Sequence, residues 1–410
     1  MKEMKIFTLA ISIILLTITV ILPFGFFDGD SFKKEINEKY TIEDTSINSI
    51  NDIVFVSIDM EENQPFDLSK NIRKQSDFGS IGKNDVVLID GAITKNMKEL
   101  KTSILYDNID TLIENSNPVI VIANDPGLIT NRDNLRFATA FTDEADVFCI
   151  YYESTTGATH SHSITGRTIE ESLSIAYKWT KDLLIEDKSL SSGNDINFIS
   201  PPGTYWALAA TSNVTKTCED FGMMSVKSFH YMLMGYPRGT NYVMTSYQLQ
   251  GEPFDISTYW DRYNAVADMG IANNLSNRQE LMTYSPTASG GNTTIGVNMN
   301  IGVSGNGVSG NIGGTWSYTV PDIVFHNDTS YSSNKFDVWY DFNEKGVNKT
   351  NTQEIRPGML TSGYIDGRWP YLYEYNETDV YKITFYRDRH PSLMDMMETF
   401  TESVRVYIPF

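Results

Sequence analysis

The run Pro118-Val-Ile-Val-Ile-Ala123 decides the fold class of the first half of the chain. It is apolar throughout and has the length of a β-strand. The runs Ile53-Val-Phe-Val-Ser-Ile58, Asp85-Val-Val-Leu-Ile-Asp90 and Asp146-Val-Phe-Cys-Ile-Tyr-Tyr152 have the same character. A strand with one solvent-exposed face alternates apolar and polar residues. Nearly continuous apolar strands are instead typical of a parallel sheet with helices on both faces.

Helical patterns lie between these strands. Apolar residues recur at helical spacing across 96–115, and Thr168 with Glu171 forms a capping box that opens a second helix. We therefore predict that residues 51–190 form a small parallel-sheet α/β domain. The polar segment 28–50 is predicted to be a linker in front of it.

The second half of the chain has a different pattern. Strand-like segments separated by turn residues occur at 223–233, 242–249, 295–303, 312–320, 335–342, 369–375, 380–387 and 402–408. This pattern predicts an antiparallel β-sandwich over 204–410. The predicted fold class is therefore α/β plus all-β, preceded by an N-terminal membrane helix.

The N-terminus carries the targeting signal. Lys2 and Lys5 precede an uncharged apolar run over 6–27, which matches the ~20 residues of a membrane helix. The lysines should stay in the cytoplasm and send the rest of the chain outward. A cleavable signal has a shorter apolar core and a small-residue cleavage site, which this run lacks. We predict a signal anchor over 1–27 that contacts the membrane through residues 6–27, with an extracytoplasmic bulk; secretion after cleavage is the alternative.

Glycosylation sequons agree with an extracytoplasmic location. All of them fall after residue 200, which indicates that the second half is the displayed one. The acceptor positions are Asn213, Asn274, Asn292, Asn327, Asn348 and Asn376.

Charge and cysteine content exclude some classes of protein. The formal net charge is −20, which would repel nucleic acid, because nucleic-acid binding depends on Lys and Arg. The two cysteines, Cys149 and Cys218, form no CxxC motif, so a zinc ribbon or a thioredoxin-like site is excluded. They are compatible with one disulfide in an oxidising compartment and equally with two buried thiols.

Two groups of residues could bind a divalent cation. Asp59, Asp90, Asp125 and Glu153 each follow a predicted parallel strand, and ligands bind at that edge of an α/β sheet. His160 and His162 lie two apart on the outgoing strand of a predicted hairpin over 151–164, so they share a face. Both groups have an ordinary explanation too: Asp is a favoured helix cap, and two histidines fall short of a zinc ligand set. We predict no other cofactor.

The most unusual segment is a stretch of 41 residues, 281–321, without a charged residue. Within it apolar and small polar residues alternate on either side of Asn306-Gly307, which predicts a β-hairpin over 295–320 with one apolar and one polar face. Such a hairpin can pack on a sandwich core, or it can enter a membrane as part of an oligomeric barrel. The apolar positions are Ile295, Val297, Met299, Ile301, Val303, Ile312, Trp316 and Tyr318.

Two family resemblances follow from these patterns. The strands at 85–90 and 118–123 resemble those of receiver and flavodoxin-like domains, although the lysine that a receiver carries after its last strand is absent from Cys149-Ile-Tyr-Tyr-Glu153. The uncharged hairpin between sandwich strands, within 205–410, resembles the leukocidin and haemolysin type of β-barrel pore-forming toxin. That resemblance implies a homo-oligomer and aromatic contacts with lipid head groups.

Three functions are consistent with the sequence. The first is a non-enzymatic surface protein that displays a β domain for an extracellular partner or for envelope structure. The second is a leukocidin-like membrane-perturbing protein, and the third is a metal-dependent hydrolase at the strand-end acids. No nucleophile elbow, P-loop or zinc-protease motif is present in the sequence, which favours the first.

Overall fold

The structure is a computed structural model that describes residues 53–56, 72–75, 81–82, 85–90, 104–122, 137–142, 144–185, 198–199, 203–235, 240–275, 279–285, 293–295, 300–304, 307–311, 318–320, 323–342, 352–364 and 374–409. The predicted anchor over 6–27 and the linker over 28–50 lie outside these residues. Within the described ranges, no helix is long and apolar enough to cross a membrane.

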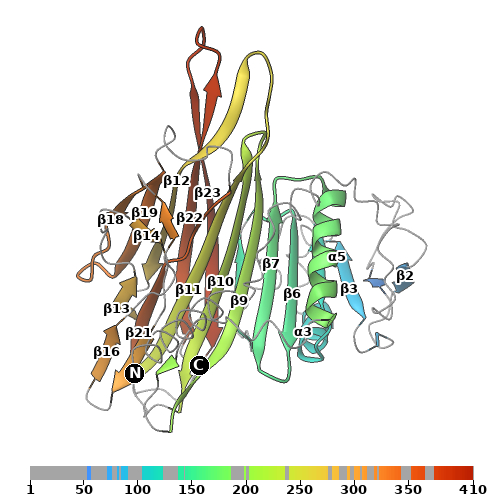
Figure 1. Ribbon diagram of the computed structural model, residues 1–410. Helices are drawn as coiled ribbons and strands as arrows, with labels where there is room; N and C mark the ends of the chain where they lie inside the picture. The colour runs from blue at the N-terminus through green and yellow to red at the C-terminus, as the bar shows by residue number, and fades with distance from the viewer. Residues whose placement is uncertain are drawn as a thin grey trace, which may run out of the picture. The chain divides into compact units, whose positions relative to one another are not determined.

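The larger of the two main sheets has twelve strands (Figure 1). Strand β20 (Gln353–Ile355) pairs with β11, beside the main path. The other strands, in spatial order, are β13 (Gln279–Ser285), β21 (Gly358–Tyr364), β11 (Thr240–Pro253), β10 (Gly222–Met234), β9 (Tyr205–Cys218), β7 (Ala158–Thr165), β6 (Val147–Glu153), β4 (Val119–Ile122), β3 (Val86–Asp90), β1 (Ile53–Val56) and β2 (Ile72–Gln75).

The predicted fold class is wrong, because this sheet joins both halves of the chain. Strands β2, β1, β3 and β4 are parallel, but β6 runs antiparallel to β4. A tight turn with Gly157 at φ +77 then reverses the chain into β7. The free edge of β7 pairs in parallel with β9, so the sheet continues into the antiparallel strands of the second half. The resemblance to a receiver or flavodoxin-like domain therefore ends at β4.

The second main sheet has six strands in the order β18 (Ile323–Asn327), β19 (Lys335–Phe342), β12 (Asp261–Leu275), β22 (Glu374–Arg389), β23 (Met396–Pro409) and β5 (Thr139–Thr142). All of its pairings are antiparallel. The strand β5 comes from the first half of the chain. After β4 the chain crosses from the first sheet to the second, forms β5 there, and returns to the first sheet as β6. This crossing allows β6 to pair antiparallel with β4.

Two helices cover opposite faces of the strands β3, β4 and β6. Helix α3 (Ile104–Glu114) packs Ile109 and Ile113 on one face, and α5 (Ile169–Ile185) packs Leu173 and Tyr177 on the other. Burial on both faces explains why these strands are apolar throughout. The predicted capping box of α5 is confirmed: the Glu171 amide donates to Thr168 Oγ1, and the Thr168 amide donates to Glu171 Oε2, each over 3.3 Å.

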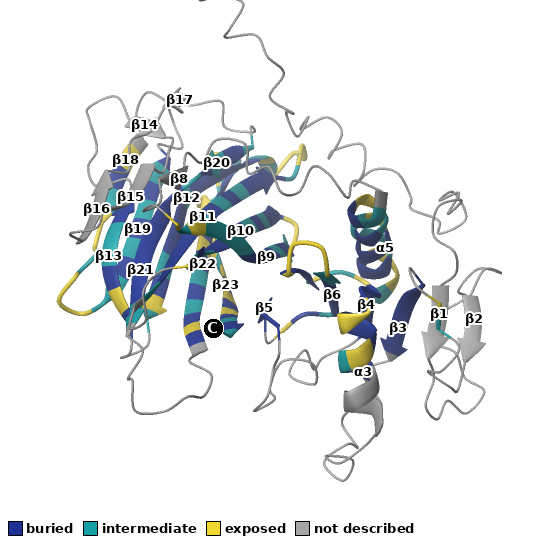
Figure 2. Cartoon of the chain, turned by 90° about the horizontal axis from the view of Figure 1, so that it is seen from below, coloured by how far each residue is buried: buried dark blue, intermediate teal, exposed yellow. Residues whose placement is uncertain are grey.

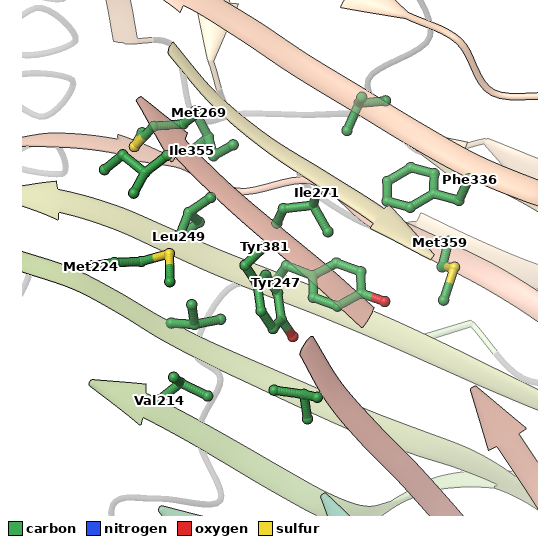
Figure 3. Close-up of a cluster of buried hydrophobic side chains, with 14 of the residues drawn as sticks. Val214, Met224, Tyr247, Leu249, Met269, Ile271, Phe336, Ile355, Met359 and Tyr381 are labelled. Atoms are coloured by element: carbon green, nitrogen blue, oxygen red, sulfur yellow. The ribbon is translucent and has the colours of Figure 1, made fainter. Parts of the chain in front are cut away.

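The largest hydrophobic core lies between β9–β11 of the first sheet and β12, β19 and β22 of the second (Figures 2 and 3). Its inward residues recur at every second position, as on β19, where Phe336, Val338 and Tyr340 are buried. This is the alternation expected of sheets that pack face to face. Strands of the second half therefore pack face to face, and both sheets also contain strands from the first half.

Candidate functional site

Of the four strand-end acids, the two whose backbone is described lie at opposite ends of β4. Asp59 and Asp125 lie outside the described residues, and so does the side chain of Asp90, although its backbone ends β3. Glu153 ends β6. Because β6 is antiparallel to β4, with Ile150 opposite Val119, Glu153 lies at the end where β4 begins. Asp90 pairs with Ile122, at the other end of β4.

The two histidines of β7 are buried and have different partners. The Nδ1 atom of His160 is 2.9 Å from Thr211 Oγ1, and its Nε2 is 3.6 Å from a carboxylate oxygen of Glu153. That contact lowers the pKa of Glu153 to about 2. The Nε2 atom of His162 is 3.1 Å from Thr215 Oγ1, and burial lowers the pKa of this imidazole to about 3. Neither histidine belongs to a group of three close ligand atoms in the described part of the chain.

Another group does bring three such side chains together. His230 on β10 and Glu377 and Asp379 on β22 present ligand atoms that all lie within 4.8 Å of one another. The strands belong to different sheets, so the group bridges the sandwich. Nδ1 of His230 is 3.3 Å from Oε1 of Glu377, and both side chains are fully buried.

Polar side chains from β22 itself and from the strands β11 and β12 surround this cluster. Asp379 Oδ1 accepts hydrogen bonds from the Tyr247 hydroxyl and the Asn273 amide, each over 2.6 Å. Its Oδ2 accepts from the Tyr381 hydroxyl over 3.1 Å. Oε2 of Glu377 accepts from the Tyr375 hydroxyl. The carboxylates are thus held in fixed orientations inside the largest core of the protein.

Burial sets the protonation of the cluster. Desolvation raises the pKa of Glu377 and the pKa of Asp379 to about 7 each. It lowers the pKa of His230 to about 4. Water stabilises the charged form of each group, and the hydrogen bonds of the buried core replace this stabilisation only in part. Burial therefore favours the neutral form of each of the three groups.

The sequence carried a signal for this cluster that our predictions missed. Tyr375, Glu377, Asp379 and Tyr381 occupy alternate positions, which continue through Ile383 and Phe385. Residues two apart share a face of a strand, so two acids sit on an otherwise apolar and aromatic face. We predicted a strand break at the polar residues 376–379, and β22 instead runs unbroken over Glu374–Arg389.

Two short antiparallel pairings of the predicted uncharged hairpin fall within the described residues. Strand β14 (Thr293–Ile295) pairs with β17 (Tyr318–Val320), and β15 (Asn300–Ser304) pairs with β16 (Gly307–Asn311). The register sets Val303 opposite Val308 and Asn300 opposite Asn311. Directly opposed residues share a face, so these two pairs match apolar with apolar and polar with polar, whereas Ile301 lies opposite Gly310 and Thr293 opposite Val320. Val297, Met299, Ile312 and Trp316 lie outside the described residues.

One further pairing holds the hairpin. Strand β8 (Phe198–Ile199) runs parallel to β15, with Phe198 opposite Ile301. The strands β16, β15 and β8 form a small sheet that is separate from the two large ones. A two-residue pairing is a weak attachment for a hairpin of this length.

An exposed apolar surface lies where the β22–β23 hairpin projects beyond the neighbouring strands (Figure 1). Tyr259, Trp260, Met394 and Met397 are 71%, 51%, 87% and 61% exposed. The His390 ring stacks on Tyr259 with 5.2 Å between centroids. We call these five residues the aromatic tip.

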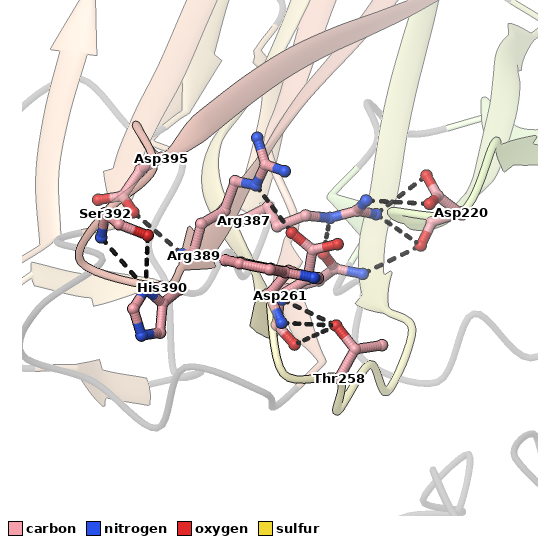
Figure 4. A network of polar contacts seen from close by, with 10 residues as sticks. Asp220, Thr258, Asp261, Arg387, Arg389, His390, Ser392 and Asp395 are labelled. Carbon is pink, nitrogen blue, oxygen red and sulfur yellow. Dashed lines mark hydrogen bonds and ion pairs between the residues drawn. The ribbon is translucent and has the colours of Figure 1, made fainter.

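Ion pairs hold the aromatic tip in place (Figure 4). Arg389 Nε donates to Asp261 Oδ1 over 2.8 Å, and the Arg389 amide donates to Asp395 Oδ1 over 3.0 Å. Behind them, Arg387 donates to Asp220 over 2.9 Å and lies 4.0 Å from the Phe221 ring centroid. The tip is therefore a supported surface at the end of two long strands.

The sequons and cysteines occupy varied sites. Asn274, Asn327 and Asn376 are exposed. Asn213 lies within β9, and its amide donates to the Ser161 carbonyl over 3.2 Å. Asn292 and Asn348 lie outside the described residues. Cys149 and Cys218 are both buried, free thiols, so the two-thiol alternative holds in this structure.

Comparisons with known proteins give little beyond the geometry. No family model matches the chain, and no curated protein matches it. Among solved structures, Clostridium perfringens delta-toxin is similar over 50% of this chain and 93% of its own, with a TM-score of 0.32 and 10% sequence identity. A similarity at this level does not assign a function.

Proposed function

We propose that this protein acts on membranes from the extracytoplasmic side, and that the hairpin Thr293–Val320 is the segment that enters the lipid bilayer. The observation that carries the proposal is an uncharged hairpin whose register sets Val303 opposite Val308, Ile295 opposite Tyr318 and Asn300 opposite Asn311. A transmembrane β-strand needs ~9–11 residues with outward apolar and inward polar positions. Both arms of this hairpin are long enough.

A single hairpin cannot span a bilayer alone, because its two edges would leave unpaired backbone groups in lipid. Closure into a barrel requires hairpins from several copies. The proposal therefore includes a homo-oligomer in the membrane-bound state, and it treats the pairing of β15 with β8 as the arrangement before insertion.

The aromatic tip supports the same proposal. Tyr and Trp are enriched at membrane interfaces, where an apolar ring and a polar edge are both accommodated. Methionine adds a flexible apolar side chain. A fixed surface with Tyr259, Trp260, Met394 and Met397 is suited to contact a bilayer before the hairpin enters it.

The second candidate is a displayed surface protein that binds an extracellular partner without entering a membrane. The pairing of Ile301 with Phe198 favours it, because the hairpin is then paired with another segment of the same chain. In this case the aromatic tip contacts a protein partner.

Dye release from liposomes separates the two candidates. The purified full-length protein should release dye and form a defined oligomer. Ile301→Asp places a charge on the apolar face and should abolish release, whereas the neighbouring Asn300→Asp on the polar face should retain it. Equal release by both variants, or no release by folded wild-type protein on several lipid compositions, would refute the membrane proposal.

A further inference from the structure

The cluster inside the sandwich contains a carboxylate oxygen without a hydrogen bond. Oε1 of Glu377 is buried and accepts none, although it lies 3.3 Å from Nδ1 of His230. Beside it, the buried Oδ1 of Asn273 also lacks a partner. A buried polar atom without a partner is costly, and native proteins leave few of them.

The partners of His230 decide what its two nitrogens can do. Nε2 lies 2.9 Å from the Ser228 hydroxyl, which can accept the proton of a neutral imidazole. In that tautomer Nδ1 carries the lone pair, and it lies near both Glu377 Oε1 and Thr245 Oγ1, each over 3.3 Å. A cation between Nδ1 and Oε1 would then satisfy the lone pairs of both atoms.

A histidine that binds a metal ion has this arrangement. Its non-ligating N–H is fixed by a neighbouring acceptor, and the ligating carboxylates are held by further hydrogen bonds. Ser228 can fill the first role. The hydroxyls of Tyr375, Tyr381 and Tyr247 fill the second, since they donate to Glu377 and Asp379.

We propose that His230, Glu377 and Asp379 bind a zinc ion inside the β-sandwich. Zinc takes imidazole nitrogen and carboxylate oxygen at ~2.0–2.2 Å in a tetrahedral arrangement, which sets neighbouring ligand atoms ~3.3–3.6 Å apart. The His230–Glu377 separation of 3.3 Å already fits, and all three ligand atoms lie within 4.8 Å of one another. Calcium and magnesium prefer six or more oxygen ligands, which this cluster does not offer.

The ion would join the two sheets, because His230 comes from β10 and both acids come from β22. Binding in a fully buried site is coupled to folding. The full-length protein should therefore be unfolded in urea with a chelator, then refolded with Zn²⁺ or with chelator alone, and dialysed before the metal is counted by mass spectrometry.

The expected result is one zinc per chain and a higher melting temperature for the zinc-refolded protein. Glu377→Gln and Asp379→Asn should lose the bound ion, and Ser228→Ala should weaken binding ~10–100-fold, as outer-shell losses do. Glu153→Gln is the matched control, since Glu153 also lies beside a buried histidine, at 3.6 Å from His160, but that pair belongs to no three-ligand group.

Loss of zinc in the control as well, or undiminished zinc in Glu377→Gln, would overturn the proposal. If the Glu377 variant does not fold, the wild-type protein refolded with Co²⁺ tests the site instead. Bound Co²⁺ should give the absorption of a four-coordinate site with nitrogen and oxygen ligands, and a refolded chain that retains no cobalt and no zinc would also refute the site.

Discussion

The hydroxyl of Tyr247 on β11 donates a hydrogen bond of 2.6 Å to Oδ1 of Asp379 on β22, so a polar contact crosses the largest hydrophobic core from one sheet to the other. Tyr247 is 1% exposed and Asp379 is 0% exposed. An ionised carboxylate in such a place depends on its donors, because water cannot replace them.

Removal of this donor should therefore destabilise the fold. We expect Tyr247→Phe to lower the free energy of unfolding by about 1–3 kcal/mol, the cost of a buried acceptor that loses its partner. Urea denaturation measures it. Tyr205→Phe is the control, because Tyr205 is 61% exposed and should change stability by no more than about 0.5 kcal/mol. Equal effects of the two substitutions would show that the contact is unimportant.

The packing between the sheets depends on Gly251. A Cβ added there would lie 2.2 Å from Ile383 Cδ1 and 3.0 Å from Val266 Cγ2. We expect Gly251→Ala to cost about 1–3 kcal/mol through overpacking, as measured by thermal or urea unfolding. At Gly363, on a strand of the same sheet, the nearest atom to an added Cβ is 4.0 Å away. Gly363→Ala should be near neutral, and a cost equal to that of Gly251→Ala would contradict the packing argument.

A disulfide can test whether the hairpin must leave β8. Phe198 and Ile301 are Cα partners on adjacent parallel strands, which lie ~4.8 Å apart and within the range of a disulfide. We expect the double variant Phe198→Cys/Ile301→Cys to release no liposome dye when oxidised and to recover release when reduced. The single variants are the controls. Full release by the oxidised double variant would show that this pairing persists during any membrane action.

Buried His162 predicts a pH dependence of stability. Its pKa in the folded protein is lowered to about 3, against an ordinary value near 6.5. Between these two values the unfolded chain binds a proton that the folded chain excludes, so stability falls as pH decreases by about 1.4 kcal/mol per pH unit. His162→Gln should remove this part of the slope between pH 6 and pH 4 in urea titrations at each pH. Above pH 7 the two proteins should show parallel curves, and an unchanged slope below pH 6 would refute the assignment.

Sequence patterns predicted the local elements well. Strand 335–342 matches β19 (Lys335–Phe342) at both ends, and the hairpin over 151–164 matches β6 and β7. The capping box at Thr168 marks the start of α5. Each of these depends on neighbours in the sequence, where periodicity and turn residues act directly.

Strand order could not be predicted in the same way. In the parallel pair β7–β9, Thr159 lies opposite Ala210. The sequence of neither strand indicates which strand it pairs with. The sequence predicts the hairpin of β6 and β7, but an apolar strand has the same composition in a parallel and an antiparallel sheet. The His230, Glu377 and Asp379 cluster was missed for a related reason, because it forms only when β10 and β22 face each other across the core.

The edge strand β5 has a consequence for the order of assembly. Residues Thr139–Thr142 pair with Tyr407–Val404 of β23, so a segment from the first half of the chain completes its hydrogen bonds only with the last strand. During synthesis, β5 cannot form these backbone hydrogen bonds until the C-terminal residues have left the ribosome. The second sheet can therefore close along this edge only after nearly the whole chain has been synthesised.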